Sequence, residues 1–425
     1  MSIPRDVDRG WAWIVLLAAC LMTATSDGLR NSSGIFYSQF IDSMNLSRPQ
    51  AASVVAILNA MFLLPGPLAA LLAQKIGTRW TINLGAILTA IGLFSSAFVH
   101  TYGALLATFG GITGFGLCLS FMPAMGGLPV WFTKYRQVAP ALCMTVGALG
   151  IFAMAPLIQL LVDAYSWRGA AIVVSAICLN ACFFCGTVFF PVKPTGPGRP
   201  APDRRAENKW LFASPAYLLH LTSGFFMFGI PLFWIFIVRH VTNHRGYTHQ
   251  EGAILVSVCG ISSLLGRMLF VLFNFVPRLA TKSIRFILFN LSSLFAGIAC
   301  GLMPIFWNFY IVAGICAVMG FMQGVKVATM LNVTMDITTP ARFQTGYGYF
   351  SLVVGLTVLA IPPLAGYLAE VYRCYDPVFY LSAAALGLSC AAGCLSQYYE
   401  DKRQLSVAAA DGLGPLHPLP TKPLV

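Results

Sequence analysis

Residues 251–275 read EGAILVSVCGISSLLGRMLFVLFNF, and this stretch decides what class of protein the chain is. It is about as long as a helix must be to cross the hydrocarbon core of a bilayer. Arg267 lies about 16 residues, or roughly 24 Å, from its start, where a charge costs several kcal/mol unless it meets water or a partner. Gly260, Ser263 and Arg267 share one helical face. Two interpretations follow: Arg267 binds an anionic substrate in a water-filled pathway, or it faces the helix bundle and bonds to backbone carbonyls or a carboxylate.

The composition agrees with a protein that crosses a membrane many times. Hydrophobic residues make up 58% of the 425 residues and charged residues only 9%, and the mean hydropathy is +0.77. A soluble domain carries about 25% charged residues. The 12 cysteines show no spacing typical of a metal site or a disulfide framework, so we expect no metal and no cofactor. The sequence also lacks the H-E-x-x-H and G-x-S-x-G motifs, so we do not expect an enzyme.

Twelve apolar stretches are long enough to span a bilayer as helices. They cover residues 11–36, 50–73, 80–99, 103–130, 138–161, 170–191, 211–238, 251–275, 284–304, 309–333, 346–369 and 376–397. Residues 191–209 are rich in Pro, Gly and charge, which predicts a flexible cytoplasmic linker. The linker divides the chain into two six-helix halves, 1–190 and 210–397, followed by a cytoplasmic tail, 398–425, that we expect to be disordered. The predicted fold class is an all-α membrane protein with twelve transmembrane helices.

The distribution of basic residues orients these spans. If the N-terminus is cytoplasmic, 18 of the 26 Lys and Arg residues fall in cytoplasmic segments and only 5 in outer loops. This bias is the positive-inside pattern of membrane proteins, and it predicts that both termini are cytoplasmic. The net charge of +12 is then explained by topology and by attraction to anionic lipid in the bilayer, and we expect no nucleic-acid partner.

Four further titratable residues stand inside predicted spans. Asp27 and Arg30, three residues apart in the first span, form a pair that either changes with a transport cycle or only lowers the cost of insertion. Lys326 belongs to a polar stripe of the tenth span and adds positive potential. His220 in the seventh span is either a proton relay or a packing residue. Together with Arg267 the charged residues sum to a positive value, which favours an anionic substrate.

Several motifs resemble those of one family. Residues 8–13, Asp-Arg-Gly-Trp-Ala-Trp, are similar to the acidic-Gly-Gly-Trp-Gly-Trp opening of the monocarboxylate transporter family, in the major facilitator superfamily. Residues 131–141, WFTKYRQVAPA, resemble that family's second signature, Tyr-Phe-x-Lys-Arg-Arg-x-Leu-Ala-x-Gly. Shorter motifs, such as Trp-Arg-Gly at 167–169 and Pro-Pro-Leu-Ala-Gly at 362–366, extend the resemblance from residue 8 to about residue 397.

The resemblance implies the major facilitator fold, in which two halves rock about a central site. Proton-coupled members carry an Asp four residues before the Arg of the eighth span and a Lys in the first span. Ser263 and Asn31 stand at those positions here, so we expect proton coupling to be weak or absent. The expected substrate-binding residues are Arg267, Lys326, Arg30, Asn31 and Ser263, and the expected proton-carrying or gating residues are Asp27 and His220.

The expected function is secondary transport or facilitated diffusion of a small organic acid or related metabolite across the plasma membrane. The resemblance also implies a single-span ancillary glycoprotein as a partner, as in related family members. Both family signatures are altered, for example at Arg9, Ala12, Trp131 and Tyr135. A transport-inactive receptor or scaffold of the same fold is therefore the alternative that the sequence leaves open.

Overall fold

The computed structural model describes residues 8–189, 211–245, 247–276, 279–338, 342–372 and 374–410. These ranges are helical almost throughout, and they contain no strand. The predicted linker, 191–209, and the last part of the predicted tail, from residue 411, lie outside the described residues. The domain boundaries at these places stay predictions.

The first half is built from α1 (Trp11–Asn31), α2 (Ser33–Met44), α3 (Arg48–Leu63), α4 (Gly66–Ile76), α5 (Thr78–Ser96), α6 (Tyr102–Leu105), the π-helical turn η1 (Leu106–Ile112), α7 (Thr113–Trp131) and α8 (Val138–Val188). Helices α1 and α2 together make one apolar span. The second span is bent by 44° between α3 and α4. Pro65 lies at this bend, where the proline ring removes a backbone donor and disturbs the helix.

Helix α8 contains two of the predicted spans. Its 51 residues would measure about 76 Å as one straight helix, more than twice the thickness of a bilayer core. Ser166 interrupts it with a φ of 60° and a ψ of 171°, outside the helical region. The chain therefore turns back at Ser166, between the stretches predicted at 138–161 and 170–191.

The second half is built from α10 (Pro215–Phe226), α11 (Gly229–Arg245), α12 (His249–Phe275), α13 (Lys282–Leu302), α14 (Phe309–Thr338), α15 (Phe343–Val371) and α16 (Asp376–Ala410). Helix α16 corrects one expectation, because residues 398–410 are helical instead of disordered. Glu400 explains part of this extension: its carboxylate accepts from Lys282 Nζ at 2.9 Å and from Arg403 Nη1 at 3.2 Å, which ties the end of α16 to α13.

Within the described residues, each of the twelve predicted stretches falls on one helix or on consecutive helices. Among the described residues, nine helices are long and apolar enough to cross a membrane, or ten if α3 and α4 count as one span. The remaining predicted spans are the second part of α8 and the 19-residue helix α5. The structure therefore has the all-α membrane architecture that the composition predicted.

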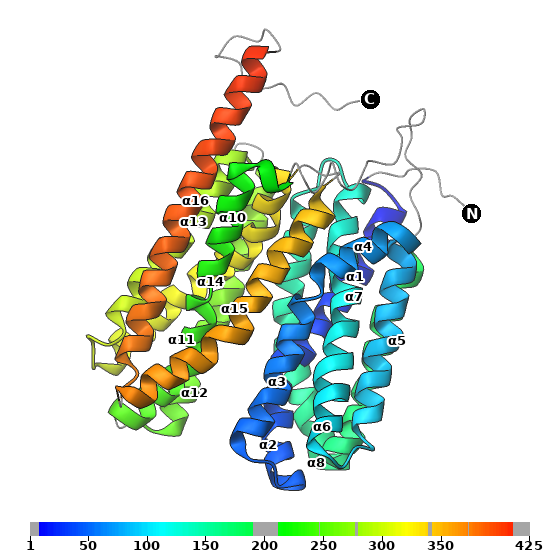
Figure 1. Ribbon diagram of the computed structural model, residues 1–425, viewed down its shortest axis with the longest axis vertical. Helices are drawn as coiled ribbons and strands as arrows, with labels where there is room; N and C mark the ends of the chain where they lie inside the picture. Colours follow the sequence, from blue (N-terminus) through cyan, green and yellow to red (C-terminus); the bar gives the residue numbers. More distant parts are fainter. Residues whose placement is uncertain are drawn as a thin grey trace.

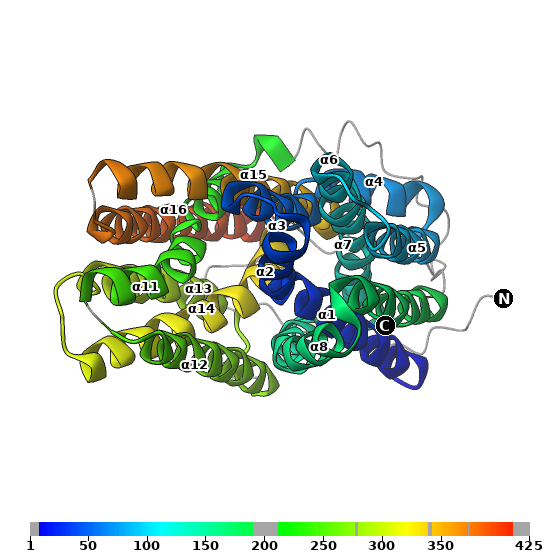
Figure 2. The ribbon, with the colours of Figure 1, turned by 90° about the horizontal axis from the view of Figure 1, so that it is seen from below.

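The helices form two bundles that lie side by side (Figures 1 and 2). Helices α1–α8 make one bundle and α10–α16 the other. At the junction α15 packs against α3 and α4, and α12 packs against α8. Gly66 and Gly348 permit one close approach: a Cβ on Gly66 would lie 2.7 Å from the carbonyl oxygen of Gly348. A hydrophobic core also crosses the junction, since Phe343, Tyr347 and Phe350 belong to the core of the first half.

The halves are held together at one end, at which α1 begins and α16 ends; it is the upper end in Figure 1 and is called the upper end below. Gln74 Nε2, at the end of α4, donates to Thr345 Oγ1, at the start of α15, at 2.8 Å. Gln137 and Asp336 meet there as well, with 3.2 Å between the amide nitrogen and a carboxylate oxygen. A further hydrogen bond between the halves, made by Arg267, lies deeper in the molecule.

Candidate functional site

A charge pair on α1 is anchored to α3. Arg30 Nη2 lies 3.2 Å from Asp27 Oδ1, one helical turn away, so the pair that the spacing allowed is present. Arg30 Nη1 donates to Asn59 Oδ1 at 3.1 Å, and its guanidinium lies 5.2 Å from the centre of the Phe62 ring. Asn59 and Phe62 are not among the residues that the sequence analysis singles out. The signal for Asn59 was present, since it is an amide in the middle of the apolar second span.

Arg267 reaches across the junction between the halves. Its side chain is buried, and Nη1 donates to the carbonyl oxygen of Met144 in α8 at 2.7 Å. Its Nε has no hydrogen-bond partner among the described residues. Arg267 also lies within electrostatic range of Asp27 and Arg30. The structure thus brings together three of the predicted residues, which come from two helices in different halves.

Helix α8 has a glycine where Asp27 packs against it. A Cβ on Gly147 would lie 2.7 Å from Asp27 Oδ2 and 2.9 Å from Thr23 Cγ2. Met144, which accepts the bond from Arg267, is three residues before Gly147 and therefore on the same face of α8. One turn of α8 consequently holds the carboxylate of Asp27 and the guanidinium of Arg267 near each other.

Tyr347 of α15 adds a residue of the second half to this centre. Its side chain is buried and lies near Asp27 and Arg30. Two predicted residues take other positions. Asn31 is exposed, and its Nδ2 donates to the backbone oxygen of Asp27 at 2.8 Å. Ser263 is buried, and its backbone lies where α12 packs closely on Gly324 of α14.

Lys326 lies inside the second half, away from this centre. Its ammonium donates to the hydroxyl of Ser293, and lies 3.4 Å from Ser389 Oγ and 3.5 Å from the carbonyl oxygen of Phe289. It also lies 3.4 Å from the centre of the Phe289 ring. No carboxylate contacts it in the part of the chain that the structure describes. Lys326 is therefore solvated by neutral groups of α13 and α16.

His220 lies in the same bundle as Lys326. Its Nε2 is 2.9 Å from Thr334 Oγ1, and its ring stacks on Phe350 with 4.7 Å between ring centres. Its Nδ1 has no hydrogen-bond partner among the described residues. The structure therefore does not bring His220 and Lys326 together with Arg267.

A cavity of about 140 Å³ lies between α12, α13 and α14. Its lining is apolar except for Ser292, and it includes Phe270, Leu288 and Val325. None of the charged residues at the junction lines it. The lining of this cavity contains no charged group to bind a carboxylate, so the charged centre at the junction is the better candidate site. No group of three or more His, Cys, Asp and Glu side chains suited to a metal occurs among the described residues.

Comparisons with known proteins give one consistent result. The family model described as Major Facilitator Superfamily matches residues 15–316 and 275–422. Monocarboxylate transporter 6 of Homo sapiens is 30% identical over 398 residues, covering 88% of this chain and 78% of that protein. Monocarboxylate transporter 13 of Rattus norvegicus is 28% identical over 386 residues, covering 89% and 87%. Monocarboxylate transporter 12-B of Danio rerio is 25% identical over 411 residues, covering 89% and 85%.

Solved structures show the same fold. The chain is similar to FucP, a Major Facilitator Superfamily transporter solved in the outward conformation, with a TM-score of 0.73. The similarity covers 91% of this chain and 99% of that one at 15% identity. A crystal structure of a variant of the E. coli fucose:proton symporter FucP gives a TM-score of 0.72 at the same coverage and identity.

Proposed function

The chain belongs to the monocarboxylate transporter family of the major facilitator superfamily, and we propose that it moves a small organic anion across the membrane by alternating access. The observation that carries this proposal is the position of Arg267. Its guanidinium lies at the junction of the halves, with one edge bonded to Met144 and with Nε unpartnered. A guanidinium edge with two free N–H groups matches the two oxygens of a carboxylate.

The charge at the junction favours a substrate with a single negative charge. Asp27 neutralises Arg30 at 3.2 Å, whereas the hydrogen bond that Arg267 makes within the described ranges goes to a neutral carbonyl. One positive charge is then left uncompensated in a buried place, where an unpaired ion is costly. A monocarboxylate would compensate it, and Tyr347 and Asn59 would offer polar contacts beside it. Lys326 would act on the anion only through its distant positive potential.

The upper end is cytoplasmic in this proposal, because the basic residues predict cytoplasmic termini. The halves would then be closed toward the cytoplasm by the contacts of Gln74 and Gln137. Proton coupling would be weak, with Asp27 and His220 as the groups able to carry a proton. We further propose the plasma membrane as the location and a single-span ancillary glycoprotein as a partner, following the family.

Uptake by the purified protein in liposomes tests the proposal. A radiolabelled panel of monocarboxylates, amino acids, creatine and carnitine should contain at least one substrate that enters saturably and exchanges with unlabelled substrate inside. Liposomes without protein and liposomes with Arg267→Gln serve as controls. If properly folded protein takes up no member of the panel above these controls, the receptor or scaffold of the same fold becomes the better account.

A further inference from the structure

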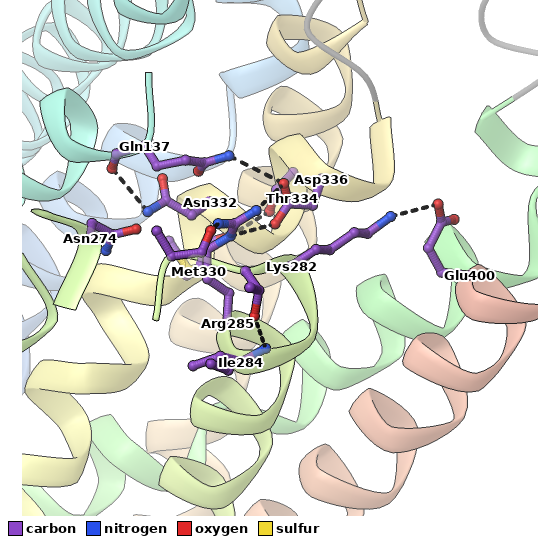
Figure 3. A network of polar contacts seen from close by, with 12 residues as sticks. Gln137, Asn274, Lys282, Ile284, Arg285, Met330, Asn332, Thr334, Asp336 and Glu400 are labelled. Carbon is purple, nitrogen blue, oxygen red and sulfur yellow. Dashed lines mark hydrogen bonds and ion pairs between the residues drawn. The ribbon is translucent and has the colours of Figure 1, made fainter. Parts of the chain in front are cut away.

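Gln137 of the first half bonds α14 of the second half at two places. Its side-chain Nε2 donates to Asp336 Oδ1 at 3.2 Å, and its backbone oxygen accepts from Asn332 Nδ2 at 3.0 Å (Figure 3). Asn332 and Asp336 are four residues apart and therefore lie on one face of α14. Gln137 directly precedes α8, so the contact joins the first turn of α8 to the end of α14.

Asp336 does not depend on Gln137 for its charge. Arg285 of α13 donates to it with two parallel hydrogen bonds, Nε to Oδ2 at 2.7 Å and Nη2 to Oδ1 at 2.9 Å. Both side chains are at most 10% exposed. Because this ion pair lies wholly within the second half, the bond from Gln137 can break without leaving a bare buried charge. The amide of Gln137 is a neutral donor, and Arg285 already neutralises the carboxylate of Asp336. The hydrogen bond between Gln137 and Asp336 is therefore suited to form and break repeatedly.

The loop that carries Gln137 is held in place by Asp8. The carboxylate of Asp8 accepts from the backbone N–H groups of Thr133, Lys134 and Tyr135 at 3.0–3.4 Å, and from the Thr133 hydroxyl. Burial alone would raise the pKa of Asp8, but these hydrogen bonds outweigh it and lower the pKa below its ordinary value. The carboxylate is therefore charged at neutral pH. Arg136 fixes the other side of the loop, with Nε bonded to the carbonyl oxygens of Pro129 and Phe132.

We propose that Gln137 is the latch that closes the upper end, and that Asp8 is a positioning residue that holds loop 132–137 so that Gln137 meets α14. The proposal rests on the alternating-access function proposed above. When the upper end opens, the two bonds of Gln137 to α14 must break. The contacts of Asp8 with the loop and of Arg285 with Asp336 each lie within one half, so they persist. The motifs at 8–13 and 131–136 thereby act as one unit.

The distance between the halves at the upper end tests this proposal without any substrate. Spin labels attached through unnatural amino acids at Lys75 and Lys402, both exposed and at the upper end of different halves, report that distance in the full chain in nanodiscs. Gln137→Ala should enlarge the population with longer distances roughly two- to tenfold, the effect of losing one hydrogen bond. Gln137→Glu should enlarge it further, because two carboxylates then face each other.

Variants of Asp8 test whether this residue positions Gln137 or only stabilises the protein. Asp8→Ala should shift the distances in the same direction as Gln137→Ala. The double variant should shift them by less than the sum of the two single shifts, because the side-chain bond of Gln137 can be lost only once, while its backbone bond to Asn332 survives Gln137→Ala. Asp8→Asn, which keeps an acceptor oxygen, should restore part of the wild-type distribution. The matched control is Gln159→Ala, since Gln159 donates to Asp163 within α8 and is exposed.

Two results would overturn the proposal. One is a wild-type distance distribution in folded Gln137→Ala, which would show that the Gln137 side chain does not hold the upper end closed. The other is a distance shift in the double variant that equals the sum of the shifts in Asp8→Ala and Gln137→Ala, which would show that Asp8 does not act through Gln137. Either result leaves the uptake experiment untouched, and a protein without transport activity would still report its distances. Failure of the latch and failure of the proposed function are therefore distinguishable.

Discussion

Arg267 Nη1 of α12 donates to the carbonyl oxygen of Met144 in α8 at 2.7 Å, which joins the two halves deep inside the molecule. A backbone carbonyl is a neutral acceptor, so this bond satisfies one N–H group without neutralising the guanidinium. Any relative motion of the halves that separates α8 from α12 must break it. A substrate carboxylate that binds Arg267 can replace the hydrogen bond to Met144 that is lost. Substrate binding is thereby linked to the relative motion of the two halves.

Arg267→Gln should reduce the apparent affinity for an identified substrate about 10- to 100-fold, since a charge-assisted contact is worth roughly 1.5–3 kcal/mol. Arg267→Lys should keep part of the activity, because it keeps the charge and loses the planar fork. The measurement is uptake at matched amounts of protein in the membrane. Wild-type uptake by Arg267→Gln would make Arg267 a structural charge and would remove the proposed site.

Gly147→Ala should impair transport several-fold without unfolding the protein. The new Cβ would lie 2.7 Å from Asp27 Oδ2, and the carboxylate, at the end of a flexible side chain, would have to move away. Its geometry with Arg30 and Arg267 would change as a result. Gly314→Ala in α14 is the matched control, because a Cβ there meets nothing within 4 Å. Equal uptake by the two variants would mean that the position of Asp27 does not matter.

The sequence predicted the spans well because lipid imposes a simple rule on composition and length. It also placed Asp27 and Arg30 within reach of each other, since their spacing along one helix decides this. It did not indicate Met144, because a backbone carbonyl has no signature in a sequence. The orientation of Lys326 was equally hidden: a polar stripe predicts a polar face, but the rotation of α14 decides whether that face meets the junction or its own bundle.

The helical end of α16 shows a different limit of sequence reasoning. The stretch after residue 397 begins with polar residues, which favoured disorder, yet Glu400 bonds both Lys282 and Arg403. The contact with Lys282 joins residues that are 118 positions apart. Propensity along the chain cannot predict such a contact, and it is tertiary packing that stabilises most helices in proteins.

Ser293→Ala should lower the free energy of unfolding by about 1–3 kcal/mol, because the ammonium of Lys326 loses an acceptor in a buried place. In a Lys326→Met background the same change should cost little, since no buried cation then needs the hydroxyl. Lys326→Met should also impair uptake much less than Arg267→Gln does. Thermal unfolding of the four proteins in detergent completes the cycle. A cost for Ser293→Ala that is the same in both backgrounds would contradict this role of Ser293.

Uptake should depend only weakly on an imposed proton gradient. Ser263, which stands where proton-coupled relatives carry an acid, has a hydroxyl that cannot serve as a proton carrier as a carboxylate does. The acid at the junction, Asp27, is already engaged in an ion pair with Arg30 at 3.2 Å. The measurement compares initial uptake rates in proteoliposomes with and without an inward proton gradient.

The variants Asp27→Asn and His220→Gln decide which group is responsible if a gradient does accelerate uptake. Asp27 is at the junction, where a proton would alter the charge that surrounds Arg267 directly. His220 is buried in the second half beside Thr334 and Phe350, so a proton there would act only through the packing of that bundle. Loss of the acceleration in Asp27→Asn alone would therefore assign coupling to the junction. A strong acceleration that persists in both variants would leave coupling without either expected carrier, and the assignment of Asp27 and His220 would have to be abandoned.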